Sequence, residues 1–176
     1  MPIISKNLNP KYISVCNNAT WVLGEISIKL GSDMAIYTHN ILTVLITNIN
    51  MNNSSKTLRE NTAITLDKIG LVCTKIVAPS LAQFVRAWCI SLRNISNNYD
   101  KDSAFRGICQ MISINPTRTV SNFIFFCDAV VNYLNPKADL KEMFRKILHA
   151  CNSHWNKFSE QFPLHLKRQL QINYGI

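Results

Sequence analysis

The feature that most limits the fold is a helical pattern that recurs about every 40 to 43 residues. Over residues 10–30, apolar side chains alternate between steps of four and three positions, which places one stripe on an α-helix. This first seam consists of Tyr12, Cys16, Ala19, Leu23, Ile26 and Leu30. Its later copies are Thr62, Leu66, Ile69 and Cys73, then Ala104, Ile108 and Met111, then Phe144, Leu148 and Cys151. Such a repeat predicts paired helices that stack into a solenoid.

The segments between the repeated helices predict further helices at residues 34–50, 79–92, 119–134 and 163–174. Ser32 and Asp33 are candidate caps for the first of these, and Pro79 and Pro163 stand at helix starts that favour proline. No segment alternates with a period of two, so we expect no sheet. The prediction is an all-α superhelix of about four HEAT repeats. Its approximate units are 1–32, 33–75, 76–116 and 117–153, with a terminal cap at 154–176.

The beginning of this array is unusual, because only residues 1–9 precede the first strong helix. That length predicts no partner helix for it. A solenoid normally covers the seam of its end repeat with a polar cap. The sequence therefore predicts an uncovered first seam, in a chain that is the C-terminal piece of a longer solenoid.

Trp21 lies off the seam, on nearly the opposite side of its helix, with Ile13 and Asn17 on its flank. A shift of about 43 residues maps it onto Ile64, close to Asn61 on the next repeated helix. Helical tryptophans are usually mostly buried, so phase alone leaves core and binding roles equally open for Trp21. For Ile64 taken alone, a core role is favoured. The asparagines could bond to neighbouring helix ends instead of a ligand.

The positive charge of the chain is spread out. Its net charge is +9 and its pI is near 9.4, values that suit an acidic partner such as nucleic acid or anionic lipid. The longest basic block, however, is Lys167–Arg168. Scattered lysines and arginines are typical of solvated helix surfaces, so nucleic-acid binding is an alternative rather than the leading hypothesis.

The cysteines are widely spaced and form no C-x-x-C pair, which predicts reduced, buried residues. His149, Cys151 and His154 could in principle bind zinc, but three ligands at a spacing that suits no helical face favour a structural role. The sequence therefore predicts no metal site.

The sequence also predicts no enzyme and no cofactor. Glu25, Asp67 and Asp102 are read as isolated carboxylates, with no nucleophile or base arranged around them. Only five glycines occur, and they form no phosphate-binding loop. The longest apolar stretch, residues 41–46, is too short to span a bilayer, so we expect a soluble protein and no membrane partner.

Several longer motifs resemble one family in order along nearly the whole chain. They are N-N-A-T-W-x-x-G-E-I-S at 17–27, K-T-L-x-E-N-T-A-I-T at 56–65, W-C-x-S-L-R-N-I at 88–95, K-D-S-A-F-R-G-I-C-x-M-I-S at 101–113, F-I-F-F-C-D-A-V at 123–130 and F-P-L-x-L-K at 162–167. They resemble the transportins (karyopherin-β2), nuclear import receptors of the importin-β superfamily. The resemblance corresponds to the last HEAT repeats of such a receptor.

The resemblance implies that this chain binds nuclear localisation signals of the proline-tyrosine class. By position, Ile13, Trp21 and Ile64 would contact the hydrophobic segment of the signal, and Asn17 and Asn61 would hydrogen-bond its backbone. Apolar pockets and free amides are what an extended peptide requires. Family signals are basic, whereas this chain carries Lys+Arg 19 against Asp+Glu 10, so the apolar contacts are expected to dominate.

The resemblance also implies partners and a location. Nuclear localisation signals of cargo proteins are the expected partners, with nucleoporins as a further class. The repeats that bind the GTPase Ran would lie outside this chain, so Ran is expected only in a full-length receptor. The protein would shuttle between cytoplasm and nucleus. A truncated scaffold or decoy without transport activity is the alternative, beside the basic solenoid that binds nucleic acid.

Overall fold

The computed structural model describes residues 2–93, 95–96, 98–151 and 162–176. Within these residues the chain is helical and has no strand, which confirms the all-α prediction. The repeated seam lies on α2 (Ile13–Leu30), α4 (Lys56–Val72), α7 (Tyr99–Ile114) and α9 (Ala138–Ala150). The partner helices are α3 (Ala35–Asn50), α6 (Leu81–Leu92) and α8 (Phe123–Val131), followed by α11 (Leu164–Tyr174).

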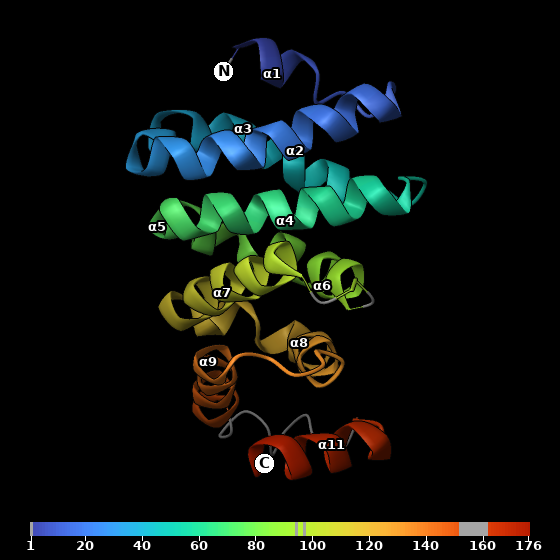
Figure 1. Cartoon of the computed structure of the whole chain (residues 1–176), viewed down its shortest axis with the longest axis vertical. Helices are drawn as coiled ribbons and strands as arrows, with labels where there is room; N and C mark the ends of the chain where they lie inside the picture. The colour runs from blue at the N-terminus through green and yellow to red at the C-terminus, as the bar shows by residue number, and fades with distance from the viewer. Residues whose placement is uncertain (1, 94, 97, 152–161) are drawn as a thin grey trace.

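The seam helices follow one another down the long axis of the molecule (Figure 1). α2 packs on α4, α4 on α7 and α7 on α9, while α3 contacts α6, α6 contacts α8 and α8 contacts α11. Each helix therefore meets its counterpart in the next unit. This arrangement of two neighbouring rows is a HEAT-repeat solenoid.

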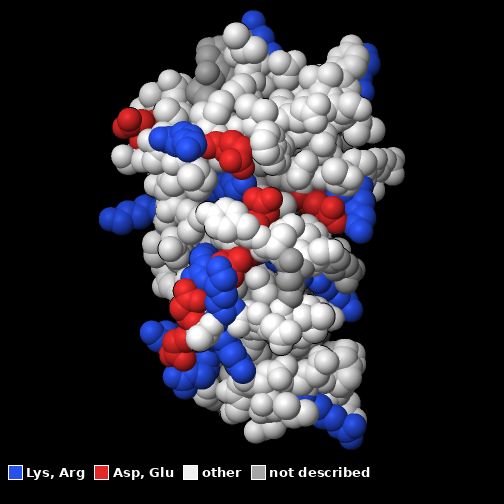
Figure 2. Space-filling view, in the orientation of Figure 1, with Lys and Arg blue, Asp and Glu red and all other residues white. Residues whose placement is uncertain are grey.

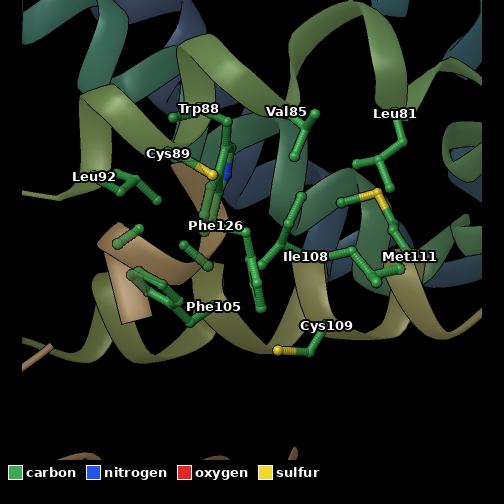
Figure 3. Close-up of a cluster of buried hydrophobic side chains, with 14 of the residues drawn as sticks. Leu81, Val85, Trp88, Cys89, Leu92, Phe105, Ile108, Cys109, Met111 and Phe126 are labelled. Atoms are coloured by element: carbon green, nitrogen blue, oxygen red, sulfur yellow. The ribbon is translucent and has the colours of Figure 1, made fainter. Parts of the chain in front are cut away.

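The repeated seam is buried in one continuous core. Positions of the seam that are fully buried include Leu23, Leu66, Ile69, Ala104, Ile108, Met111, Phe144 and Leu148. Figure 3 shows Trp88 of α6, Phe105 of α7 and Phe126 of α8 gathered where three helices meet. The rings of Trp88 and Phe105 meet edge to face, with centroids 5.0 Å apart. The apolar positions that recur in the sequence are therefore the positions that are buried in each unit.

The prediction of an uncovered first seam is wrong. Cys16 and Leu23 are fully buried, because α4 packs along α2 and the Asn48 amide of α3 contacts the Cys16 sulfur at 3.6 Å. Tyr12 does not belong to the seam, since it precedes α2 and is 62% exposed. The exposed apolar residues on α2 include Val15 and Val22, which lie two turns apart on another side of the helix.

The segment before α2 also differs from the prediction. It contains a short helix, α1 (Pro2–Lys6), and then turns back over the first unit. Leu8 is buried, and its carbonyl accepts a hydrogen bond from Asn48 Nδ2 at 3.0 Å. A buried amide of α3 thereby fixes this segment to the solenoid.

Helix boundaries follow local chemistry that the seam does not reveal. Ser32 and Asp33 do not cap α3; they lie in a 3-10 turn, Gly31–Met34, that joins α2 to α3. The helix predicted at 119–134 is shorter, because its Ser-, Thr- and Asn-containing start forms a 3-10 turn, Val120–Asn122, before α8. The helix predicted from Pro79 begins at Leu81, after α5 (Thr74–Val77) and another 3-10 turn.

Among the described residues, no single helix is long and apolar enough to cross a bilayer. The consecutive segments Lys56–Val72 and Thr74–Leu92 would qualify only together, and the chain bends by 119° between them. Leu66 and Phe84, which add to that apolar character, lie fully buried in the core.

Two glycines stand where α4 and α7 meet, and they differ in what faces them. A Cβ added to Gly107 would lie 2.7 Å from the backbone carbonyl oxygen of Asp67, whereas one added to Gly70 would meet the flexible end of Met111. Gly107→Ala should therefore force two backbones apart and lower the free energy of unfolding by about 2 kcal/mol. Gly70→Ala gains helix propensity of about 1 kcal/mol, which offsets a shift of Met111.

Urea denaturation of both variants measures the difference. The expected order of stability is Gly70→Ala at or near wild type and Gly107→Ala clearly below it. Equal midpoints would show that the α4–α7 contact can relax around an added methyl group.

Candidate functional site

The five candidate peptide-binding residues come from two neighbouring helices. Ile13, Asn17 and Trp21 are spaced four residues apart on one side of α2, and Asn61 and Ile64 lie on α4. Trp21 is 50% exposed and Ile13 is 47% exposed, large fractions for such apolar side chains. The two asparagines and Ile64 are half-buried, and Ile64 also packs against the core.

Three hydrogen bonds fix the register of α2 against α4. They join Asn61 Nδ2 to Asn17 Oδ1 at 2.9 Å, Thr65 Oγ1 to the Thr20 carbonyl at 2.8 Å, and Lys68 Nζ to Glu25 Oε1 at 2.5 Å. The paired residues are 44, 45 and 43 positions apart. Trp21 and Ile64 share this offset, so they lie at the same level on adjacent helices. The candidate residues therefore form one surface.

The two helices approach closely beside this surface. A Cβ added to Gly24 would lie 3.0 Å from Thr65 Oγ1 and 3.6 Å from Thr65 Cα. Backbones this close leave no room for one helix to slide along the other without a clash. The spacing between the α2 and α4 side chains is consequently set before any ligand arrives.

Lys68 forms a charged bridge one helical turn beyond Trp21 and Ile64. Its Nζ donates to Glu25 of α2 at 2.5 Å and to Asp100 of α7 at 2.9 Å. Burial alone would lower the pKa of Lys68, but the hydrogen bonds to the two carboxylates raise it above its usual value. The lysine is therefore charged at neutral pH, and it ties three repeats together.

This bridge carries two carboxylates for one ammonium group, so the local charge is negative. The Lys68 side chain is 5% exposed, whereas those of Glu25 and Asp100 are 45% and 38% exposed. Acidic oxygens thus border the apolar surface although the chain as a whole is basic. This acidic edge, formed by Glu25 and Asp100, was not predicted from the sequence, although the repeat offset that maps Glu25 onto Lys68 could have revealed it.

The other carboxylates interpreted as isolated also have partners. Asp67 is fully buried and accepts a hydrogen bond from the indole nitrogen of Trp88. Asp102 pairs with Arg106 at 2.8 Å, and the same guanidinium binds both oxygens of Asp139 on α9 at 2.8 and 3.1 Å. These groups join neighbouring repeats, so the prediction that they are isolated is wrong.

The cysteines are all unpaired and buried, which confirms their interpretation as small apolar residues. His154 of the possible zinc motif lies outside the described residues. Among the residues that are described, no group of three or more His, Cys, Asp or Glu side chains is arranged to hold a metal ion.

Charged side chains on the face of Figure 1 are of mixed sign. Figure 2 shows lysine and arginine interleaved with aspartate and glutamate down this face, whereas the surface over the first half of α2 is largely uncharged. That uncharged half of the helix carries Ile13 and Trp21. An apolar surface bordered by charge is typical of a protein interaction site.

Comparison with known proteins identifies relatives of this chain. No family model matches the chain. Over its whole length, however, the chain is 56% identical to Transportin-1 of Homo sapiens and of Mus musculus. The chain is a homologue of the transportins. It is also 36% identical to Transportin of Dictyostelium discoideum over 99% of its length, and 36% identical to Importin subunit beta-2 of Schizosaccharomyces pombe over 94%.

The match covers only part of each transportin. The chain spans 20% of the length of the human and mouse proteins, 19% of the Dictyostelium protein and 18% of the fission yeast protein. The resemblance noted in the sequence motifs is thereby confirmed, and so is the helical-repeat architecture that goes with it.

Proposed function

We propose that this chain is a cargo-binding part of a nuclear import receptor, which holds nuclear localisation signals of the proline-tyrosine class against α2 and α4. Ile13, Trp21 and Ile64 would receive the apolar side chains of the signal. Asn17 and Asn61 would hydrogen-bond its extended backbone. The observation that supports the proposal is that Trp21 is half-exposed and lies at the same level as Ile64, because hydrogen bonds between α2 and α4 fix the register of the two helices.

The acidic edge supports the same proposal. Localisation signals of this class are basic, and Glu25 and Asp100 present partly exposed carboxylates beside the apolar surface. Lys68 neutralises only one of the two charges. A peptide with apolar residues followed by lysine or arginine would match both parts of the surface.

Further partners and the location depend on the longer receptor. Ran and nucleoporins would be engaged by a full-length protein that carries additional repeats, and that protein would shuttle between cytoplasm and nucleus. The function is binding and release, with no chemical step. Affinity of the isolated chain should be modest, because the surface on α2 and α4 is small compared with a complete interface.

A titration with two labelled peptides tests the proposal. The first is a basic localisation signal of the proline-tyrosine class, and the second replaces its apolar residues with serine while keeping its charge. Fluorescence anisotropy should show saturable binding of the first peptide and at least about tenfold weaker binding of the second. If both peptides bind equally well, charge alone drives the interaction. If neither peptide binds, the proposal is wrong.

A further inference from the structure

A second hollow surface lies between the end of α3, the turn that follows it and the outer side of α6. It has a volume of about 550 Å³, and a neighbouring hollow of about 190 Å³ shares Arg59, Ile90 and Ser91 with it. We call the two together the α3–α6 groove; Asn52, Lys56, Arg59, Arg86, Ala87 and Ile90 line it. None of the five candidate peptide-binding residues does so.

The α3–α6 groove carries more positive than negative charge. Lys56, Arg59 and Arg86 face it, against the single carboxylate of Glu60, which lies 3.6 Å from Lys56 Nζ. Among the residues that the structure describes, neither arginine has a carboxylate within ion-pair distance. Arg59 Nη1 donates to the carbonyl of Ser54 at 2.5 Å, which holds the guanidinium in place without neutralising it.

Arg86 is held by an aromatic ring. Its guanidinium carbon lies 4.7 Å from the centre of the Phe125 ring on α8. A stacked guanidinium keeps its N–H groups at its edge, where they can bind both oxygens of a carboxylate. The residue is exposed, so this edge is open to a ligand.

The groove also has an apolar part and a fixed width. Ile90 lies one turn beyond Arg86 on α6 and is 54% exposed, with Ala87 beside it. Asn50 Nδ2 donates to the carbonyl of Ile46 at 2.8 Å and to that of Gln83 at 2.9 Å. This amide bridges α3 and α6, so the groove is formed before a ligand binds.

We propose that the α3–α6 groove binds an acidic linear segment of another protein. Carboxylates of the segment pair with Arg59 and Arg86, and an aliphatic side chain packs on Ile90. Nucleic acid fits less well, because no aromatic side chain among the described residues lines either hollow for base stacking and the groove offers few cations for phosphates. The partner is thus opposite in charge to the basic signals expected on α2 and α4.

A peptide titration tests this proposal on the full chain. The probe is a fluorescein-labelled peptide of twelve residues, all glutamate or aspartate except for two central leucines. Arg86→Gln should weaken its binding about tenfold, because a charge-assisted pair with a carboxylate is lost. Ile90→Ser should weaken it about fivefold through the lost apolar contact. Lys75→Gln, which removes the same charge from an exposed residue outside the groove, should change it less than about twofold.

Two control peptides test whether the apolar contact and the location of the site are as proposed. A peptide with serine in place of the leucines should bind more weakly than the probe and should not respond to Ile90→Ser. Binding of the localisation-signal peptide should be unchanged in Arg86→Gln, so failure here is separate from failure of the α2–α4 site. The proposal is overturned if the wild-type chain does not bind the acidic probe. It is also overturned if Arg86→Gln and Lys75→Gln weaken binding equally, or if single-stranded RNA binds through Arg86 in place of the peptide.

Discussion

A chain with Trp21→Ala should bind a localisation-signal peptide at least about thirtyfold more weakly than the wild type. Truncation of a central aromatic contact typically costs about 2 kcal/mol or more, which corresponds to that ratio of dissociation constants. The fold should be unaffected, because half of the side chain is in solvent and exposed positions tolerate substitution. Anisotropy titration measures the affinity, and circular dichroism measures the helix content and the melting temperature.

Val22→Ala is the matched control for Trp21→Ala. Val22 is also exposed and apolar on α2, but it projects from another side of the helix, away from Asn17 and Ile64. Its truncation should leave the affinity within about twofold of wild type. If Trp21→Ala binds as tightly as the wild type, Trp21 is not a contact. If both variants lose affinity equally, the loss belongs to α2 as a whole.

Trp88→Phe should lower the free energy of unfolding by about 3 kcal/mol. The indole is fully buried and donates to the equally buried Asp67 carboxyl, whose other oxygen has no hydrogen-bond partner among the described residues. Phenylalanine removes the donor and leaves the carboxyl without a hydrogen bond, at about 1 to 3 kcal/mol. The smaller ring also leaves a gap in the core, which adds to the loss. Urea denaturation at fixed pH measures the change.

The same pair makes stability depend on pH. Burial raises the pKa of Asp67 well above its usual value, and the bond from Trp88 partly counteracts this. The folded chain therefore holds a proton that the unfolded chain releases above about pH 4. The free energy of unfolding should therefore fall as the pH rises from about 4 to the pKa that Asp67 has in the folded chain. The slope should be at most about 1.4 kcal/mol per pH unit.

Asp67→Asn isolates this effect, because it keeps an oxygen for Trp88 and cannot ionise. Hydrogen bonds to Arg106 and Arg145 lower the pKa values of Asp139 and Glu142. Their contributions have the opposite sign and are complete above about pH 5. The stability of the variant should thus be flatter than wild type between about pH 5 and 8. Parallel curves would show that Asp67 does not titrate in this range.

The repeat could be predicted from sequence because it imposes the same burial at each unit. Leu23, Leu66, Ile108 and Leu148 recur in phase and are all fully buried. Helix ends were less predictable, because they depend on competition between a few polar groups. Ser32 and Asp33 have the chemistry of caps, yet Gly31 at φ 55° turns the chain into a 3-10 segment instead.

The candidate site, too, could be predicted from the sequence only in part. The position of Trp21 off the seam follows from its phase, which any helix of this sequence would share, but phase left open whether the side chain is buried or exposed. The bonds of Lys68 to Glu25 and Asp100, and of Trp88 to Asp67, join residues 43, 32 and 21 positions apart. Such pairs depend on how far each repeat is rotated against the next. That rotation comes from packing along the whole interface, including the close contacts at Gly24 and Gly107.

The amide pair between α2 and α4 has a consequence for how a peptide would lie. In their mutual bond Asn17 uses one lone pair of its Oδ1 and Asn61 uses one hydrogen of its Nδ2, so this bond leaves the Asn17 Nδ2 and the Asn61 Oδ1 unengaged. A peptide that lies across both helices could place a carbonyl at Asn17 Nδ2 and an N–H at Asn61 Oδ1. Because an extended backbone alternates these two groups in either direction, we expect the side chains of the signal, and not the asparagine pair, to set its direction along the solenoid.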